Sequence, residues 1–334
     1  MKLTVRDRFH AVMNFEPFDR LPVIEWANWW DKTLARWWSE GLDPGLTDRY
    51  EICRRLGLDV YRQQWITPDA PRPPRRGGPV AENEAAYDAM TDRLYARPRL
   101  DGELWRRWFD EQARGDCVVW FTLEGFFWHP RKVLGIEPHL YAFYDAPDWL
   151  HRINRNLLEF NLAAVEELLK LGTPDFMTFA EDMSYNNGPM LSRDQFEAFV
   201  APYYRPLVEA LKAREVRMIV DSDGDITRAA PWFEAAGLDG ILPLERQAGV
   251  DIDRLRAAHP KMRFIGHFDK MTMTRGEGAM RAEFERLLPA AAGGGFLPSC
   301  DHQTPPGVSF ADYQLYLRLF REYAAEAGRR SRSS

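Results

Sequence analysis

The sequence is poor in cysteine and contains no closely spaced cysteine pair. Its 334 residues include three cysteines, Cys53, Cys117 and Cys300, which lie far apart along the chain. Three such residues cannot form the disulfide framework of a small secreted protein, and their number is typical of a reducing compartment. A metal site in this chain must therefore draw mainly on histidine and carboxylate side chains.

Long apolar runs and an excess of positive charge are also missing. No stretch approaches the roughly 20 apolar residues that a membrane-spanning helix needs, and charges interrupt the N-terminal segment where a signal peptide has its apolar core. The 44 Lys and Arg residues against 50 Asp and Glu residues leave a net charge of −6, and no basic stripe is present. We expect a cytoplasmic protein with a small-molecule substrate and with neither a nucleic-acid nor a membrane partner.

Eight short apolar runs are present, each followed by polar residues and then by a stretch of helical period. They cover residues 21–26, 58–65, 117–124, 175–182, 217–225, 240–245, 263–270 and 295–302. Strands that alternate with helices indicate parallel βα units, and eight such units close a barrel. The sequence predicts an α/β fold, a single (β/α)8 TIM barrel over residues 1–328 with an insertion after strand 2, and a disordered tail at 329–334.

A doubly wound sheet is the alternative fold. No Gly-x-Gly-x-x-Gly motif follows the first run, so dinucleotide binding has no support. We prefer the barrel, in which the active site lies at the carboxyl ends of the strands. The residues that end each run are therefore the candidate site.

The segment VDSDGD ends the fifth run with Asp221 and Asp223, whose spacing of two lets both carboxylates face one cation. An Asx turn that leads into the next helix is the alternative. The segment CDHQTPPG places Cys300 and His302 in a loop after the last strand, which lies beside the first strand in a barrel. We predict Asp221, Asp223 and His302 as metal ligands, with Cys300 as an alternative ligand.

Other strand ends supply catalytic and binding candidates. The fourth run ends with Glu181 and Asp182, and strand alternation favours Glu181 as the one that faces the mouth and serves as a base. Asp182 and His267 are the other catalytic candidates. The substrate-binding candidates are Trp26, Trp65, Glu124, Glu245 and Lys270. The Trp-rich segment that begins at Glu25 predicts either a buried helix face or a stacking wall for a substrate.

Three longer segments resemble one known family. They are TVRDRFHAVMNFEPFDRLPV, EDMSYNNGPMLSRDQFEAFVAPYYRPL and GGFLPSCDHQTPPGVSFADY. With these segments the chain resembles the uroporphyrinogen decarboxylase superfamily, which also contains corrinoid-linked methyltransferases. The resemblance implies a (β/α)8 barrel with a mouth deep enough for a tetrapyrrole or a corrinoid.

The resemblance favours the methyltransferase branch. The decarboxylases have a substrate-binding Arg soon after the first strand and an essential Asp after the second, whereas this chain has EWANWWDK and QQWITP there. The methyltransferases bind zinc through a His-x-Cys-Gly pair and a closing-loop Cys, and these places correspond here to Asp221, Asp223 and His302. The resemblance thus implies a divalent metal, zinc first with iron or manganese as alternatives, and a corrinoid methyl carrier on a partner protein.

Three functions follow as hypotheses. The first is a metal-assisted methyltransferase that moves a methyl group between a small thiol or methoxy substrate and a protein-bound corrinoid. The second is a metal-independent decarboxylase or lyase that acts on a carboxylated substrate other than uroporphyrinogen. The third is a corrinoid- or tetrapyrrole-binding protein, for which the tryptophans would form the wall. A homodimer is expected, because barrels of this family often pair.

Overall fold

The computed structural model describes residues 3–27, 29–73 and 75–333. The chain forms two compact units, each built from several chain segments. The first unit comprises Met1–Arg62, Glu111–Val118 and Ile241–Ser334, and the second comprises Gln63–Asp110 and Val119–Gly240. No helix within the described ranges combines the length and the apolar character that a membrane crossing requires.

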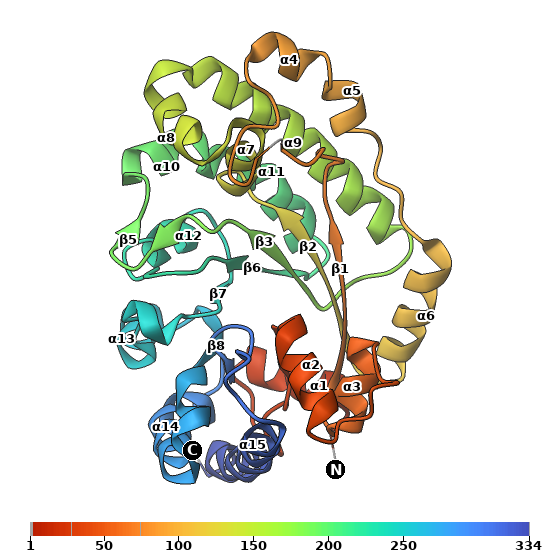
Figure 1. Cartoon of the computed structure of the whole chain (residues 1–334), viewed down its shortest axis with the longest axis vertical. Helices are drawn as coiled ribbons and strands as arrows, with labels where there is room; N and C mark the ends of the chain where they lie inside the picture. Colours follow the sequence, from red (N-terminus) through yellow and green to blue (C-terminus); the bar gives the residue numbers. More distant parts are fainter. Residues whose placement is uncertain (1–2, 28, 74, 334) are drawn as a thin grey trace. The chain divides into compact units, whose positions relative to one another are not determined.

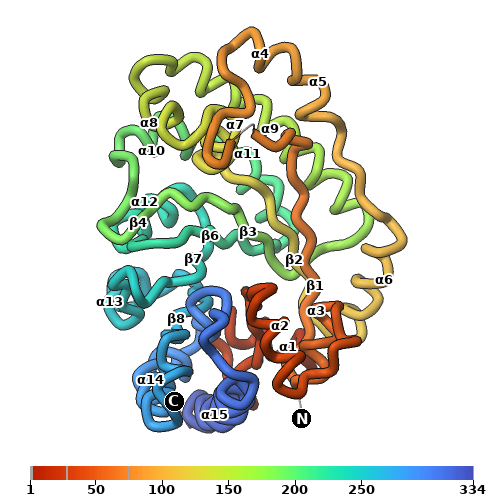
Figure 2. The backbone as a smooth tube through the Cα atoms, viewed as in Figure 1, coloured from red at the N-terminus to blue at the C-terminus, as the bar shows by residue number. Residues whose placement is uncertain are grey.

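Figures 1 and 2 show helices and strands alternating along much of the chain. The α-helices are α1 (Val5–Met13), α2 (Asp31–Ser39), α3 (Arg49–Arg55), α4 (Glu84–Asp88), α5 (Thr91–Leu94), α6 (Gly102–Ala113), α7 (Trp128–Leu134), α8 (Ile136–Asp145), α9 (Pro147–Leu169), α10 (Arg193–Phe199), α11 (Ala201–Lys212), α12 (Ala230–Ala235), α13 (Ile252–Ala258), α14 (Glu277–Ala292) and α15 (Phe310–Ser331). The 3-10 helices are η1 (Arg246–Ala248) and η2 (Lys270–Arg275). The strands are β1 (Val60–Ile66), β2 (Cys117–Glu124), β3 (Phe176–Ala180), β4 (Ser184–Tyr185), β5 (Gly188–Pro189), β6 (Arg217–Asp221), β7 (Gly240–Leu242), β8 (Arg263–Phe268) and β9 (Phe296–Cys300).

The second unit is centred on three adjacent parallel strands, β2, β3 and β6 (Figure 1). Every residue of β2 and β3 is buried. Such continuous apolar strands are typical of parallel sheets that are covered on both faces. The register pairs Glu124 with Ala180 and Ala180 with Asp221, so the carboxyl ends of the three strands form one row.

The long helix α9 covers this part of the second unit. It begins with Pro147, whose fixed φ suits the first helical turn. Its buried side chains recur at helical spacing, and two of them are asparagines. Asn154 donates to the carbonyl of Phe126 at 3.0 Å, and Asn161 donates to the carbonyl of Glu124 at 3.1 Å. These bonds fix the segment that follows β2.

The first unit contains the strand–helix–strand arrangement β8, α14 and β9, with β8 parallel to β9. Helix α14 packs on α15 through aromatic side chains. The ring of Phe268 lies 4.5 Å from that of Phe284 and 4.8 Å from that of Tyr316, measured between centroids. Burial of such large rings supplies much of the stabilising apolar contact in this unit.

The first predicted strand, residues 21–26, is not a strand. The segment lacks a ladder of backbone bonds, and its link to the start of β1 is a bond from the amide of Asp59 to the carbonyl of Val23, at 2.9 Å. Its other end is fixed by a side chain, because the carboxylate of Glu25 accepts the amide of Cys300 at 3.1 Å. Side-chain bonds thus replace the expected strand pairing.

The other seven predicted strands are present as β1, β2, β3, β6, β7, β8 and β9, and they occur in the sheet in that order. The fold is therefore α/β with a parallel sheet of seven strands, consistent with a TIM-like barrel. Strand β7 is short, three residues, where the sequence predicts a run of six. The eighth strand of the predicted barrel is not found in the described ranges.

The predicted insertion lies between β1 and β2. It contains three helices, α4, α5 and α6, rather than an irregular loop alone. Helix α4 is tied to α9 by an ion pair in which Arg152 contacts Glu84 at 2.7 Å. Contacts of this kind join the segment to the second unit.

The C-terminal helix enters the segment that was predicted to be a tail. Helix α15 ends at Ser331, so it includes the first three residues of the range 329–334. Arg329 and Arg330 both pair with Glu326, at 2.7 and 2.8 Å. Such pairs one helical turn apart support the last turn of an exposed helix.

Candidate functional site

Three aspartates converge at the carboxyl ends of β3 and β6. Asp221 is the last residue of β6, Asp223 follows two residues later, and Asp182 follows β3. One carboxylate oxygen of each lies within 4.8 Å of the others. All three side chains are half-buried. We call Asp182, Asp221 and Asp223 the acidic cluster.

Local backbone geometry builds the acidic cluster. The carbonyl of Asp221 accepts the amides of Glu181 and Asp182, at 2.8 and 3.3 Å, which draws the end of β3 onto β6. Asp182 has a φ of 39°, a left-handed conformation that Asp tolerates better than most residues. Its carboxylate then accepts the amide of Asp223 at 3.3 Å.

Gly224 permits a close approach beside the acidic cluster. Its φ is 81°, and a Cβ at this position would lie 2.7 Å from the backbone nitrogen of Tyr185. The absence of a side chain lets the small β4–β5 hairpin contact the turn after β6, where the amide of Asp225 donates to the carbonyl of Tyr185 at 2.9 Å. The Tyr185 side chain on this hairpin remains half exposed.

The electrostatics of the acidic cluster are unfavourable for three negative charges. Burial raises the pKa of Asp221 well above its ordinary value, and the neighbouring charges of Asp182 and Asp223 raise it further. A cation would relieve this repulsion, and so would a proton. The acidic cluster can therefore hold a metal ion, or Asp221 can keep its proton to a higher pH than an ordinary aspartate does.

Glu181 was expected to face the mouth as a base, but it is completely buried. Its carboxylate accepts the amides of Phe126, Phe127 and Trp128 at 2.8, 2.8 and 3.2 Å, and also the hydroxyl of Tyr204. Burial raises its pKa to about 7 although these bonds favour the charged form. Glu181 thus supports the turn before α7, while its neighbour Asp182 joins the acidic cluster.

Gly125 makes this support of the turn sterically feasible. A Cβ at residue 125 would lie 2.1 Å from the carboxyl carbon of Glu181. Any larger residue would push the carboxylate away from its three backbone donors. The hydrogen bonds of Glu181 after β3 therefore depend on the missing side chain at Gly125 after β2.

Glu124, a predicted substrate-binding residue, is buried at the end of β2. Its carboxylate contacts the Nδ1 atom of His129 at 2.7 Å and the ammonium group of Lys132. Burial alone would raise the pKa of Glu124, but the hydrogen bond from His129 and the charge of Lys132 outweigh it, and the pKa lies below its ordinary value. Glu124 is consequently an ionised partner of Lys132.

Known proteins resemble this chain at two levels. Residues 131–323 match the family described as uroporphyrinogen decarboxylase (URO-D), which is more than half of the chain. The chain belongs to the uroporphyrinogen decarboxylase family. No curated protein sequence matches it.

Solved structures resemble the chain in fold. A methyltransferase from Methanosarcina mazei has a TM-score of 0.65 and 13% sequence identity, and the alignment covers 96% of this chain and 99% of that one. A candidate vitamin-B12-independent methionine synthase from Listeria monocytogenes has a TM-score of 0.45 and 14% identity, with 93% and 98% covered. The Methanosarcina likeness extends over nearly both chains and agrees with the α/β fold described above.

The closing-loop candidates of this family member belong to the first unit. Cys300 is buried, burial raises the pKa of its thiol well above the ordinary value, and its carbonyl accepts the indole N–H of Trp26 at 2.6 Å. The ring of His302 lies 6.3 Å from that of Trp26 in an edge-on arrangement. The acidic cluster lies in the second unit and contains Asp182 as its third member, so the predicted ligand role of His302 stays a prediction.

His267, predicted to be catalytic, is fully buried in the first unit. Its Nδ1 atom bonds the carbonyl of Leu244 at 2.8 Å, and its Nε2 atom accepts the amide of Ile252 at 3.3 Å. Burial is the main cause that lowers its pKa to about 4, so the ring is neutral at pH 7. Both nitrogens are thus engaged within the fold.

Lys270 and Glu245 lie after β8 and β7 in the same unit. The ammonium of Lys270 contacts the buried carboxylate of Asp301 at 3.0 Å and the amide oxygen of Gln247 at 2.6 Å. Glu245 is half-buried and directly precedes η1. Lys270 and Asp301, which follow the ends of β8 and β9, thus form an ion pair.

The tryptophans divide between core and surface. Trp37 is fully buried and its ring lies 4.4 Å from that of Tyr313, and Trp29 is 6% exposed. Trp30 and Trp65 are 45% and 48% exposed. The Trp-rich segment is thus partly a helix face in the core, and Trp65 at the end of β1 remains available to a ligand.

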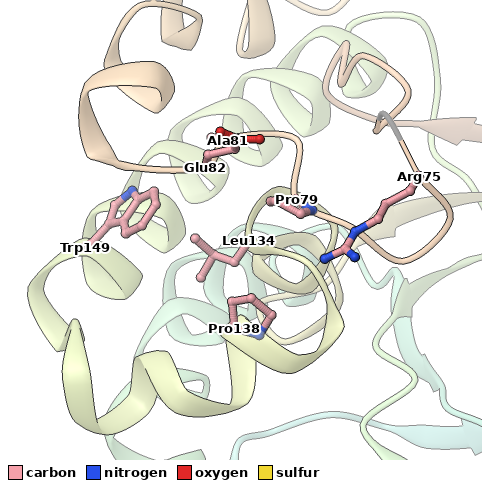
Figure 3. A pocket seen from close by; sticks show the side chains of 7 residues that line it. All are labelled: Arg75, Pro79, Ala81, Glu82, Leu134, Pro138 and Trp149. Atoms are coloured by element: carbon pink, nitrogen blue, oxygen red, sulfur yellow. The ribbon is translucent and has the colours of Figure 1, made fainter.

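A hollow of about 390 Å³ lies in the second unit, and Figure 3 shows the side chains that line it. It lies between the segment of residues 75–82 and helices α7, α8 and α9, with Arg75 at one side and Trp149 at the other (Figure 3). None of the predicted site residues lines this hollow. The acidic cluster is therefore the candidate site for the chemistry.

Proposed function

We propose that this protein is a methyltransferase of the uroporphyrinogen decarboxylase family that uses a divalent metal held by Asp182, Asp221 and Asp223. Its reaction would move a methyl group between a small methoxy or thiol substrate and a corrinoid on a partner protein. The observation that carries the proposal is the convergence of three carboxylates within 4.8 Å of one another at adjacent strand ends. The likeness to the Methanosarcina methyltransferase supports this choice within the family.

The acidic cluster fits a metal ion by charge and by donor type. Asp221 is held beside two other carboxylates although each would repel it, an arrangement that a divalent cation stabilises. Carboxylate oxygens are hard donors that suit manganese or magnesium, whereas zinc is favoured by added imidazole ligands. When bound, the metal would act as a Lewis acid on a substrate oxygen or sulfur.

The same donor set favours methoxy substrates over thiols. Zinc sites that activate thiols are rich in soft thiolate ligands, and the described acidic cluster offers oxygen atoms only. In the proposed reaction the bond between the methoxy oxygen and its methyl carbon would break, and the methyl group would pass to the reduced corrinoid of the partner. The substrate oxygen then needs one proton.

The residues around the acidic cluster would bind and orient the substrate. The side chain of Tyr185 is half exposed on the hairpin that contacts the turn after β6, and its ring would offer the substrate an apolar face. Glu181 holds the turn before α7 through three backbone amides, and we assign it this positioning role in place of the predicted role as a base. Arg131 of α7 donates to the carbonyl of Asp182 at 3.3 Å, which connects α7 to the acidic cluster.

The test is a spectroscopic methyl-transfer assay with free cobalamin in place of the partner. Metal-loaded protein is mixed with cob(I)alamin and a panel of methoxy compounds and methylated thiols, and formation of methylcob(III)alamin is followed by absorbance. We expect transfer by the wild type and by Asp225→Asn, whose parent carboxylate accepts the amide of Thr227 at 3.0 Å. Asp223→Asn is expected to be inactive. Equal rates in the two variants, or no transfer from any compound, would contradict the proposal.

A metal-independent lyase is the second candidate. The raised pKa of Asp221 favours it, because its carboxyl group keeps a proton to a higher pH than an ordinary aspartate does and could donate that proton to a carbanion. This candidate predicts that chelators leave turnover of a carboxylated substrate unchanged while Asp221→Asn abolishes it. Loss of turnover after chelation would exclude the lyase.

A further inference from the structure

A chain of hydrogen bonds connects Glu124, at the end of β2, with Asn156 of α9. The buried imidazole of His129 joins the two ends: its Nδ1 atom lies 2.7 Å from the carboxylate of Glu124, and its Nε2 atom lies 2.9 Å from the hydroxyl of Tyr95. The Tyr95 hydroxyl accepts a bond from Tyr87 at 3.0 Å, and that of Tyr87 accepts one from Asn156 at 2.8 Å. Each link is within ordinary hydrogen-bond length.

The donors along this chain have a consistent direction. Because the Tyr95 hydroxyl accepts from Tyr87, its own proton is free to point to Nε2 of His129. The ring then carries its proton on Nδ1 and donates it to ionised Glu124. Burial raises the pKa of Tyr95, so this residue acts through its neutral hydroxyl.

One end of the chain reaches the surface. Tyr95 and Asn156 line a hollow of about 730 Å³ between the segment that follows α5 and the outer face of α9. Tyr95 is half-buried, whereas Tyr87, His129 and Glu124 are buried. Water in the hollow can therefore reach Tyr95, and protons must pass through the side chains beyond it.

The other end lies at the same sheet edge as the acidic cluster. Glu124 pairs with Ala180 and Ala180 pairs with Asp221, so Glu124 and Asp221 leave the same face of three adjacent parallel strands. Lys132, which contacts Glu124, keeps about a third of its side chain exposed. An ionised carboxylate and an accessible ammonium group therefore end the chain near the proposed site.

We propose that Tyr95, His129 and Glu124 form a proton relay from the surface hollow to Lys132 at the carboxyl edge of the sheet. In one passage a proton moves from Tyr95 to Nε2 of His129 while the Nδ1 proton moves to Glu124, and water in the hollow returns a proton to Tyr95. A turn of the imidazole ring then restores the tautomer with its proton on Nδ1 before the next passage. Lys132 is the group that gives its proton to the substrate, and Glu124 returns one to it. Tyr95 and His129 are positioning residues, because neither touches the substrate.

The purpose of the relay rests on the proposed function. Cleavage of a methoxy group leaves an oxygen that takes up one proton per turnover, and the relay would supply that proton from water. The conduction of protons itself does not depend on the reaction. It can be measured on the resting protein, so failure of the relay and failure of the methyltransferase proposal are distinguishable.

The test measures how fast the buried Nδ1 proton of His129 exchanges with water. The full chain is labelled with 15N-histidine, the His129 signal is assigned by substitution, and exchange is followed by NMR at neutral pH. The relay predicts that Tyr95→Phe slows exchange, because the path from the hollow is cut while the ring of residue 95 is kept. A purely structural hydrogen bond predicts the opposite, since its loss would make local opening and exchange about fivefold faster.

The control is Tyr141→Phe, which removes an exposed hydroxyl from α8 and should leave exchange unchanged. An exchange rate in Tyr95→Phe that equals or exceeds that of the wild type would overturn the relay. The 15N shifts of the wild type give a second test that needs no variant. They must report a proton on Nδ1, and a neutral His129 with its proton on Nε2 would overturn the relay as well.

Discussion

Removal of one charge from the acidic cluster should stabilise the metal-free protein. Asp221→Asn keeps the shape of the side chain and removes a negative charge that the other two carboxylates repel. At 4.8 Å and an effective dielectric constant of about 20, each pair of carboxylates repels by about 3.5 kcal/mol. Part of this repulsion is already relieved by proton uptake, since the pKa of Asp221 is raised. We expect the variant to gain roughly 1 to 3 kcal/mol in free energy of unfolding.

The sign of the pH dependence is fixed by the direction of the pKa shift. Because the pKa of Asp221 is raised by folding, its contribution to stability is full below the ordinary Asp range and is lost as the pH rises through the folded value. The asparagine side chain does not ionise, so the variant does not lose this contribution as the pH rises. The advantage of Asp221→Asn should therefore grow from pH 4 to pH 8.

The assay is chemical denaturation in the presence of a chelator, repeated with manganese or zinc. The wild type should be stabilised by the metal, while Asp221→Asn should be stable without it and insensitive to it. A variant that loses metal binding and gains stability is expected where like charges are held together to bind a cation. A variant that is less stable than the wild type in chelator, or that responds equally to metal, would refute the electrostatic reasoning.

Three further predictions concern buried groups. Gly125→Ala should destabilise the protein by about 1 to 3 kcal/mol, because the new methyl group overlaps the carboxylate of Glu181. The control Gly278→Ala should not, because no atom lies near its new Cβ. Thermal denaturation compares the two variants, and equal effects would contradict the close-approach argument. Glu25→Gln should raise the free energy of unfolding by about 2 kcal/mol at pH 8 and leave it unchanged at pH 4. The reason is that burial raises the pKa of Glu25 from 4.5 to about 6, so the ionised form is the one that costs stability. Denaturation across this pH range tests the prediction, with the exposed Glu51→Gln as control. Tyr204→Phe removes the hydroxyl donor of Glu181 and should cost about 1 to 3 kcal/mol of stability at pH 8, and an unchanged unfolding midpoint would show that the hydroxyl contributes nothing.

The parallel strands were the most predictable part of the fold. The run 117–124 is mostly apolar because both faces of the strand are covered, and that pattern is visible without a structure. Residues 21–26 carry a similar pattern for a different reason. Val23 and Glu25 are buried, but bonds to Asp59 and Cys300 hold this segment in place of strand pairing, and composition does not reveal such bonds.

The acidic cluster was predictable in part. Asp221 and Asp223 were identified from their spacing at a strand end. The choice between Glu181 and Asp182 depended on the left-handed backbone of Asp182, which reverses the expected alternation after β3. Sequence patterns seldom reveal a single residue with positive φ unless it is glycine.

Tyr204 and Gly125 were missed as functional neighbours of the cluster. Tyr204 lies on α11, 23 residues from Glu181, and its apolar surroundings resemble those of any core tyrosine. Gly125 follows β2 directly, and a glycine between Glu124 and two phenylalanines was the available signal of a close approach. Such pairings depend on which strands become neighbours, and spacing along one chain does not specify that.

The metal content of the protein tests the central claim most directly. Wild type, Asp223→Asn and Asp225→Asn are purified without added metal, incubated with manganese, zinc or iron, desalted and analysed by plasma mass spectrometry. The account predicts about one equivalent of one metal in the wild type and in Asp225→Asn, and none in Asp223→Asn. Wild-type protein that retains no metal after incubation, or an Asp223→Asn variant that retains as much as the wild type, would contradict it.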